Sequence, residues 1–120
     1  MIVIHVKRVY EPADPQDGMR VLVDRLWPRG ISKEQLKADL WLKEVAPSTA
    51  LRQWFHSDLS EWEEFQRRYT AELDEHRPAL RALLERAAGG TITLMYSTRD
   101  IEHNHAQVLR DYLLRLEQAE

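Results

Sequence analysis

Short runs of apolar, mostly β-branched residues recur along the chain and predict strands. The run Ile2–Val6 is almost continuously apolar, which is typical of a strand covered on both faces. Similar runs predict further strands at Val21–Val23, from Leu40 to about Val45, and at Thr91–Tyr96. The chain therefore has the strands for one small sheet.

Apolar residues spaced three or four positions apart predict helices between and after these runs. The residues of these stripes that we expect to be buried against the sheet are Trp62, Phe65, Tyr69, Leu109, Leu113 and Leu116. The signals for helix ends are a capping box at Ser32–Gln35, a start at Pro47-Ser48, a second capping box at Ser60–Glu63, a start at Pro78, a stop at Gly89-Gly90 and a cap at Asp100.

Strands separated by helical crossovers predict a single α/β domain over residues 1–120. The expected architecture is a small three-layer sandwich, with a mostly parallel sheet of about four strands and helices on both faces. Residues 10–19 hold two prolines and the turn signal Asp17-Gly18, and they leave no room for a crossover helix. This loop predicts either a wide hairpin or an irregular parallel connection, so the direction of the first strand stays open.

Composition narrows the function classes further. The chain has 120 residues, of which 43% are hydrophobic and 31% charged, and it has no cysteine, which excludes a disulfide scaffold and thiolate chemistry. No run of 18 apolar residues and no signal-peptide pattern are present, so we expect a cytoplasmic protein without membrane contact. The net charge of −3 divides into +2 over residues 1–52 and −5 over residues 53–120, which makes the first part the expected anion-binding half.

Polar residues follow each predicted strand, at the edge where open parallel sheets bind ligands. Many of them are Lys or Arg, and two helix N-termini expected near Ser48 and Asp100 could add backbone N–H groups to the same crevice, so we expect a ligand that carries phosphate or carboxylate. We predict that Lys7, Arg8, Arg25 and Arg29 converge on one anion. The predicted ligand-binding residues are Lys7, Arg8, Tyr10, Arg25, Trp27, Arg29, Lys43, Ser48, Arg52, Arg99 and Asn104.

Candidate catalytic residues lie in the same region. Asp24 directly follows an apolar run, so burial would suit it to act as a general base unless Arg25 or Arg52 pairs with it. Ser97 and His103 lie at a strand-to-helix turn, which is catalytic or merely capped. We predict Asp24, Ser97 and His103 as catalytic and expect no metal or cofactor. Trp27 serves equally well as a stacking platform or as a core residue.

Several motifs occur along nearly the whole chain. They are Lys7-Arg8-Val9-Tyr10, Asp17-Gly18 with the segment from Arg20 to Gly30, Trp41-Leu42-Lys43, Ala46-Pro47-Ser48, Leu51-Arg52 with Trp54, then Trp62, Phe65, Tyr69, Glu72-Leu73 and the segment from Tyr96 to Asn104. Together they resemble the domain-of-unknown-function family 488, in its short YeaO-like branch. The resemblance implies no settled activity. The family's longer branch has Cys-His-Arg where this chain reads Asn104-His105-Ala106, so chemistry that needs the thiol cannot be carried over.

We therefore expect a domain that binds a phosphate-bearing ligand, namely a nucleotide, a sugar phosphate or a nucleic-acid end. The predicted catalytic residues favour an enzyme over a pure binder. The alternative is a nucleic-acid-binding or regulatory module without catalysis, which the interleaved arginines and aromatic residues favour and the acidic second half disfavours. A third possibility is a partner-binding domain that uses the helix of Trp62 and Tyr69 as its surface.

Overall fold

The computed structural model describes residues 2–55 and 58–119, which form one parallel sheet covered by helices. In this part of the chain the strands are β1 (Val3–Arg8), β2 (Met19–Leu22), β3 (Leu40–Trp41) and β4 (Thr91–Tyr96). Their order in the sheet is β1-β4-β2-β3, and every neighbouring pair is parallel. The central strand β4 is the apolar run that the sequence predicted, with the same bounds.

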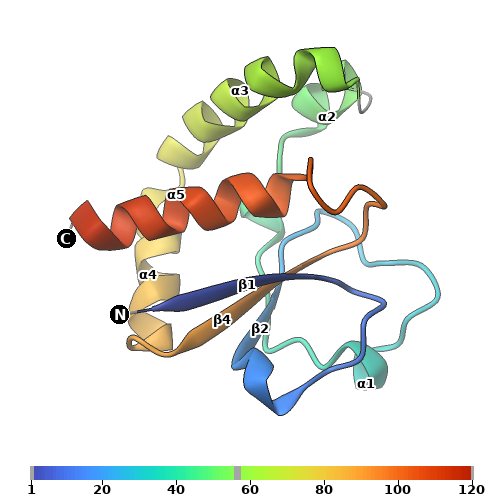
Figure 1. Cartoon of the computed structure of the whole chain (residues 1–120), viewed down its shortest axis with the longest axis vertical. Helices are drawn as coiled ribbons and strands as arrows, with labels where there is room; N and C mark the ends of the chain where they lie inside the picture. The colour runs from blue at the N-terminus through green and yellow to red at the C-terminus, as the bar shows by residue number, and fades with distance from the viewer. Residues whose placement is uncertain (1, 56–57, 120) are drawn as a thin grey trace.

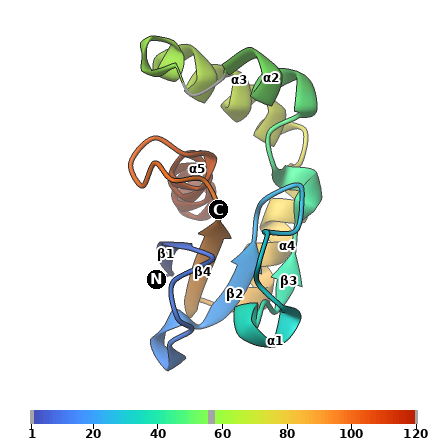
Figure 2. The same ribbon diagram turned by 90° about the vertical axis from the view of Figure 1, so that its right-hand side faces the viewer.

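Helices cover both faces of this sheet, which confirms the predicted α/β class. The helices in the described residues are α1 (Lys33–Leu36), α2 (Thr49–Phe55), α3 (Trp62–Asp74), α4 (Arg77–Ala87) and α5 (His105–Ala119), and the 3-10 turns are η1 (Pro15–Asp17), η2 (Lys43–Val45) and η3 (Leu59–Glu61). The helices α4 and α5 pack on one face of the sheet, and Leu36 of α1 packs on the opposite face; Figure 2 shows α2 and α3 lying beyond α5. None of these helices has both the length and the apolar character needed to cross a membrane.

The main core lies between the sheet and α3, α4 and α5. The stripe residues predicted to be buried are buried there, except that Trp62 is partly buried at the border of this core. A smaller apolar cluster of Val9, Leu22, Leu36 and Met95 fills the opposite face. The stripe predictions succeed because the spacing of three and four residues places those side chains on one side of a helix.

The connection from β1 to β2 is the irregular parallel one, and β4 inserts between the two strands. Asp17 in this connection is 5% exposed, and its backbone oxygen accepts a hydrogen bond from the Thr93 hydroxyl on β4. Gly18 follows with φ of +65°, and a Cβ there would lie 2.3 Å from the Thr91 carbonyl oxygen. Asp17-Gly18 is thus a close approach of the loop to the sheet.

Some predicted boundaries differ from those in the structure. β1 continues through Lys7 and Arg8, β2 begins at Met19, and β3 ends at Trp41, where η2 follows. The capping box at Ser32 forms with Gln35, but the box at Ser60 does not, because Asp58 caps η3 and α3 begins at Trp62. Asp100 accepts the amides of Glu102 and His103, whereas Asn104 caps α5 through the amide of Gln107.

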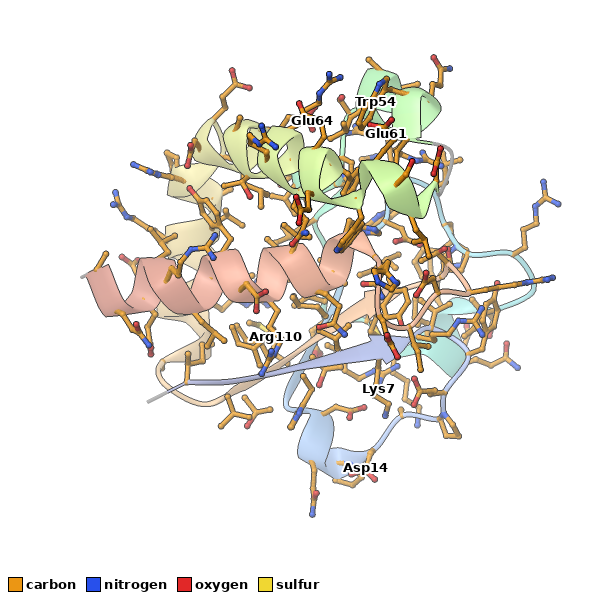
Figure 3. The ribbon with its side chains drawn as sticks, turned by 45° about the horizontal axis from the view of Figure 1, so that its top comes forward. Lys7, Asp14, Trp54, Glu61, Glu64 and Arg110 are labelled. Carbon is orange, nitrogen blue, oxygen red and sulfur yellow. The ribbon has the colours of Figure 1, made fainter. Side chains whose placement is uncertain are left out.

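The outer edge of β1 is closed by side chains. Arg110 reaches from α5 to donate to the Ile4 carbonyl oxygen at 2.8 Å, and Figure 3 shows it between the helix and the strand. The Ile2 amide donates to Glu117, and the Arg8 amide donates to Glu11. These bonds occupy outward-facing backbone groups that an edge strand otherwise offers to another chain.

Candidate functional site

The strands end together at one side of the molecule. In Figure 1 the loop after β2 and the loop between β4 and α5 both lie on the right of the view. The residues that follow β1, β2 and β4 there are 9–10, 24–25 and 97–99, and we call this region the carboxyl edge. Because β4 lies between β1 and β2, Ser97 and Thr98 lie at its centre.

Asp24 contacts both Ser97 and His105 at the carboxyl edge, the first through hydrogen bonds and the second as an ion pair. The Ser97 hydroxyl donates to Asp24 Oδ2 at 2.6 Å, and the Ser97 amide donates to the same oxygen at 3.0 Å. His105 Nε2, from the first residue of α5, lies 3.1 Å from Asp24 Oδ1 and 3.0 Å from the Val23 carbonyl oxygen. Since both neighbours are acceptors, Nε2 carries a proton. The group ties β2, β4 and α5 together.

The order of this group differs from that of a serine nucleophile with a histidine base. The carboxylate lies between the hydroxyl and the imidazole, so Ser97 donates to Asp24 and not to His105. Burial acts to raise the pKa of Asp24, but the hydrogen bond and charge of His105 and the hydrogen bonds of Ser97 outweigh it and hold the pKa below its usual value. A carboxylate with a lowered pKa is a weak general base.

The lowered pKa of Asp24 predicts a defined loss of stability in acid. The folded-state pKa lies below the unfolded value of about 4, so the ionised group stabilises the fold above pH 4, and this contribution disappears as the pH falls through the folded pKa. We expect Asp24→Asn to be less stable than the wild type at pH 7 and to lose less stability between pH 5 and pH 3. Urea unfolding across that range measures both, with Asp111→Asn at an exposed site as the control. Parallel pH profiles for Asp24→Asn and the wild type would contradict the assignment.

Arg8 and Arg25 are held by backbone carbonyl oxygens at the carboxyl edge. Arg8 Nη2 donates to Ser97 O at 2.9 Å, and Arg8 Nε donates to Thr98 O at 3.0 Å. Arg25 Nη2 donates to Ala46 O at 3.1 Å and to Pro47 O at 3.3 Å. In the described residues neither guanidinium forms an ion pair with Asp24. Both retain their positive charge, because a carbonyl oxygen carries no net charge to neutralise it.

Lys7 does not join this group. Successive residues of a strand point to opposite faces, so Lys7 and Arg8 diverge. Lys7 Nζ donates to Asp17 Oδ1 and Oδ2, each at 3.1 Å, and to the Pro12 carbonyl oxygen. Figure 3 places Lys7 on the side of the sheet where the loop of Asp14 lies. The structure therefore does not show the predicted convergence of Lys7 with Arg8.

The other predicted site residues lie in varied environments. Arg29, Arg52 and Arg99 are exposed, and Lys43 lies over the Trp41 ring. Several of the remaining residues have structural partners: Trp27 donates to Ile31 O and packs in the smaller core, Ser48 binds Glu72 and caps α2, Asn104 is buried and caps α5, and His103 contacts Asp100 and Trp62.

A cavity of about 220 Å³ opens beside the end of β1, lined by residues 9–12, Gly30, Ile31 and Gln35. Tyr10 forms part of its wall, and the Tyr10 hydroxyl donates to the Arg29 carbonyl oxygen at 3.0 Å. The Arg8 guanidinium carbon lies 5.1 Å from the centre of the Tyr10 ring. The cavity therefore lies next to the Arg8 guanidinium.

The family model described as "Inactive DUF488-N3 subclade" matches residues 3–120. The chain belongs to this family. It is 47% identical to "Uncharacterized protein YeaO" of Escherichia coli over 113 residues, which cover 94% of this chain and 98% of that protein. It is 44% identical to "Uncharacterized protein Rv3073c" of Mycobacterium tuberculosis and to "Uncharacterized protein Mb3100c" of Mycobacterium bovis, with 92% of each chain covered. No solved structure matches the chain significantly.

Asn104 stands at the position for which the resemblance implies a cysteine in the family's longer branch. It is 3% exposed, and its side-chain amide bonds within the turn: Nδ2 donates to Asp100 O, and Oδ1 accepts from the Gln107 amide. His105 was missed as a site residue by sequence reasoning. Its place at the start of the last helix, at the carboxyl edge, was the available signal. In the described residues no group of His, Asp and Glu side chains is placed to hold a metal ion.

Proposed function

We propose that the protein binds a phosphate-bearing small molecule at the carboxyl edge, without catalysing a reaction on it. The observation that carries this proposal is that Arg8 and Arg25 are fixed by carbonyl oxygens on either side of Ser97 and Asp24. A guanidinium has five N–H donors, and these bonds engage only some of them. Each arginine is therefore an ordered cation with unused N–H donors, and such donors can bind phosphate oxygens.

Preorganisation strengthens this proposal. An arginine that is free in solution loses side-chain entropy when it binds a ligand, whereas Arg8 and Arg25 are already ordered by the backbone. Exposed Arg29 and Arg99 lie in the adjoining loops and can add further positive charge. Asp24 is the opposing charge at the centre: Ser97 donates to its Oδ2, and His105 Nε2 lies 3.1 Å from its Oδ1, which accepts no hydrogen bond from the described residues.

Three observations support binding over catalysis. The Ser97 hydroxyl is directed to a carboxylate and not to a histidine, and His103 lies apart from Asp24, against Asp100 and Trp62. Asn104 is a helix cap in place of a thiol. The description of the matching family model also contains the word "inactive".

The first test compares two matched arginine variants. We expect ribose 5-phosphate to shift the amide NMR signals of residues 24–25 and 97–98, and Arg8→Lys to weaken its binding about tenfold, because Lys keeps the charge but loses the fork of donors. Arg86→Lys, on the exposed end of α4, is the control and should bind like the wild type. The proposal fails if these signals do not shift, or if Arg8→Lys binds as tightly as the wild type.

A nucleic-acid end is the second candidate, and exposed aromatic rings beside cations favour it. Tyr10 is 48% exposed next to Arg8, and Trp41 is 37% exposed next to Lys43. A strand that neutralises several phosphates loses affinity by orders of magnitude as salt rises, whereas one bound phosphate loses much less. Fluorescence titration of a short single strand at two salt concentrations separates the candidates, and no binding at low salt removes this one.

A further inference from the structure

We infer that the ligand of the carboxyl edge is a nucleotide whose base enters the cavity beside Tyr10. This inference rests on the proposed function and adds the identity of the group attached to the phosphate. The cavity of about 220 Å³ is below the range of about 300–1,000 Å³ that is usual for pockets enclosing a whole drug-sized ligand. It therefore suits a single ring system, with the rest of the ligand outside.

The lining of the cavity fits a flat heterocycle. Val9, Pro12 and Ile31 supply apolar surface. Glu11 Oε2 accepts a hydrogen bond from the Arg8 amide, and the described residues place no donor on Oε1. Gln35 Oε1 accepts a hydrogen bond from the Ser32 amide, and the NH₂ group of Gln35 is a donor. An acceptor and a donor beside this apolar surface match the paired donors and acceptors on the edge of a nucleobase.

Tyr10 is the candidate stacking residue. Its ring is half-exposed, yet its position is fixed by the hydroxyl bond to Arg29 O and by the Arg8 guanidinium near the ring. Base stacking on an aromatic ring is favourable for every base, because each base has a π-face. The same Arg8 that we assign to the phosphate contacts this ring, so a base site and a phosphate site adjoin.

The experiment compares UMP and AMP with ribose 5-phosphate by titration calorimetry. We expect at least one nucleotide to bind the wild type about tenfold or more tightly than ribose 5-phosphate, the size of one stacked base. Tyr10→Ala should remove this advantage, so that neither nucleotide then binds more tightly than ribose 5-phosphate. Tyr10→Phe, which keeps the ring, should retain most of the advantage, and thermal melts confirm that each variant is folded.

The outcomes separate this inference from the proposed function. Equal affinities of the wild type for ribose 5-phosphate and both nucleotides overturn the base site but leave the phosphate site standing. Equal weakening of all three ligands by Tyr10→Ala also overturns it, because Tyr10 would then act only through Arg8. If neither the nucleotides nor ribose 5-phosphate bind, the proposed function fails together with the inference.

Discussion

Asp17→Asn should lower the free energy of unfolding by about 3–5 kcal/mol, the cost of leaving a buried cation without its partner. The Asp17 and Arg20 side chains are 7% and 6% exposed and form a direct ion pair through Asp17 Oδ2 and Arg20 Nη1. Lys7 is the second cation on this carboxylate. Arg20 also donates to the Leu36 carbonyl oxygen through Nε and Nη2, so it cannot turn toward water without breaking those bonds.

Urea unfolding followed by circular dichroism at pH 7 measures this loss. Asp111→Asn serves as the matched control, because Asp111 is exposed and its contact with Arg110 is 3.8 Å long. The control should leave the unfolding midpoint nearly unchanged. A surface ion pair contributes below about 1 kcal/mol. A loss of that size for Asp17→Asn would show that the ion pairs of Asp17 with Arg20 and Lys7 do not hold the loop between β1 and β2 to the sheet.

The ion pair of Asp17 with Lys7 also explains why the strand predicted at Ile2–Val6 ends before β1 does. Lys7 and Arg8 are charged residues after an apolar run, which normally indicates the end of a strand. Lys7 remains in β1 because Asp17, ten residues later, meets its charge. This contact depends on how the loop folds back, and no local pattern of residues reports it. β4 was predicted with its observed bounds because it consists only of β-branched and apolar residues and its ends are marked locally by Gly90 and Ser97.

The candidate site was predictable in part for a similar reason. Asp24 and Ser97 follow strands that the sequence identified, and adjacent parallel strands bring their carboxyl ends together. His105 was missed because its partners, Val23 and Asp24, are about 80 residues away in the sequence. The divergence of Lys7 and Arg8, by contrast, follows from the alternation of side chains along a strand, so the predicted convergence could have been rejected from the sequence.

The helix predictions were most accurate where an apolar stripe packs in the main core, and the stripe of α3 shows this best. Phe65 is 4% exposed, and its ring lies 4.5 Å from Phe55 on α2, 5.4 Å from Trp62 and 5.9 Å from Tyr69, measured between ring centres. These contacts join α2 and α3 to the main core. The arrangement leaves little freedom for neighbouring side chains to fill a gap at this position.

Phe65→Ala should therefore lower the free energy of unfolding by about 3–5 kcal/mol, which combines the lost burial of the ring with the cost of the cavity it leaves. Leu59→Ala is the control, since Leu59 is 54% exposed and its truncation should change the unfolding midpoint little. Urea unfolding gives the energies, and near-ultraviolet circular dichroism reports the packing of the neighbouring tryptophans. A loss below about 1 kcal/mol with an unchanged aromatic spectrum would place this face of α3 outside the core. The helix would then be free to serve as a surface for another protein, the third possibility raised by its sequence.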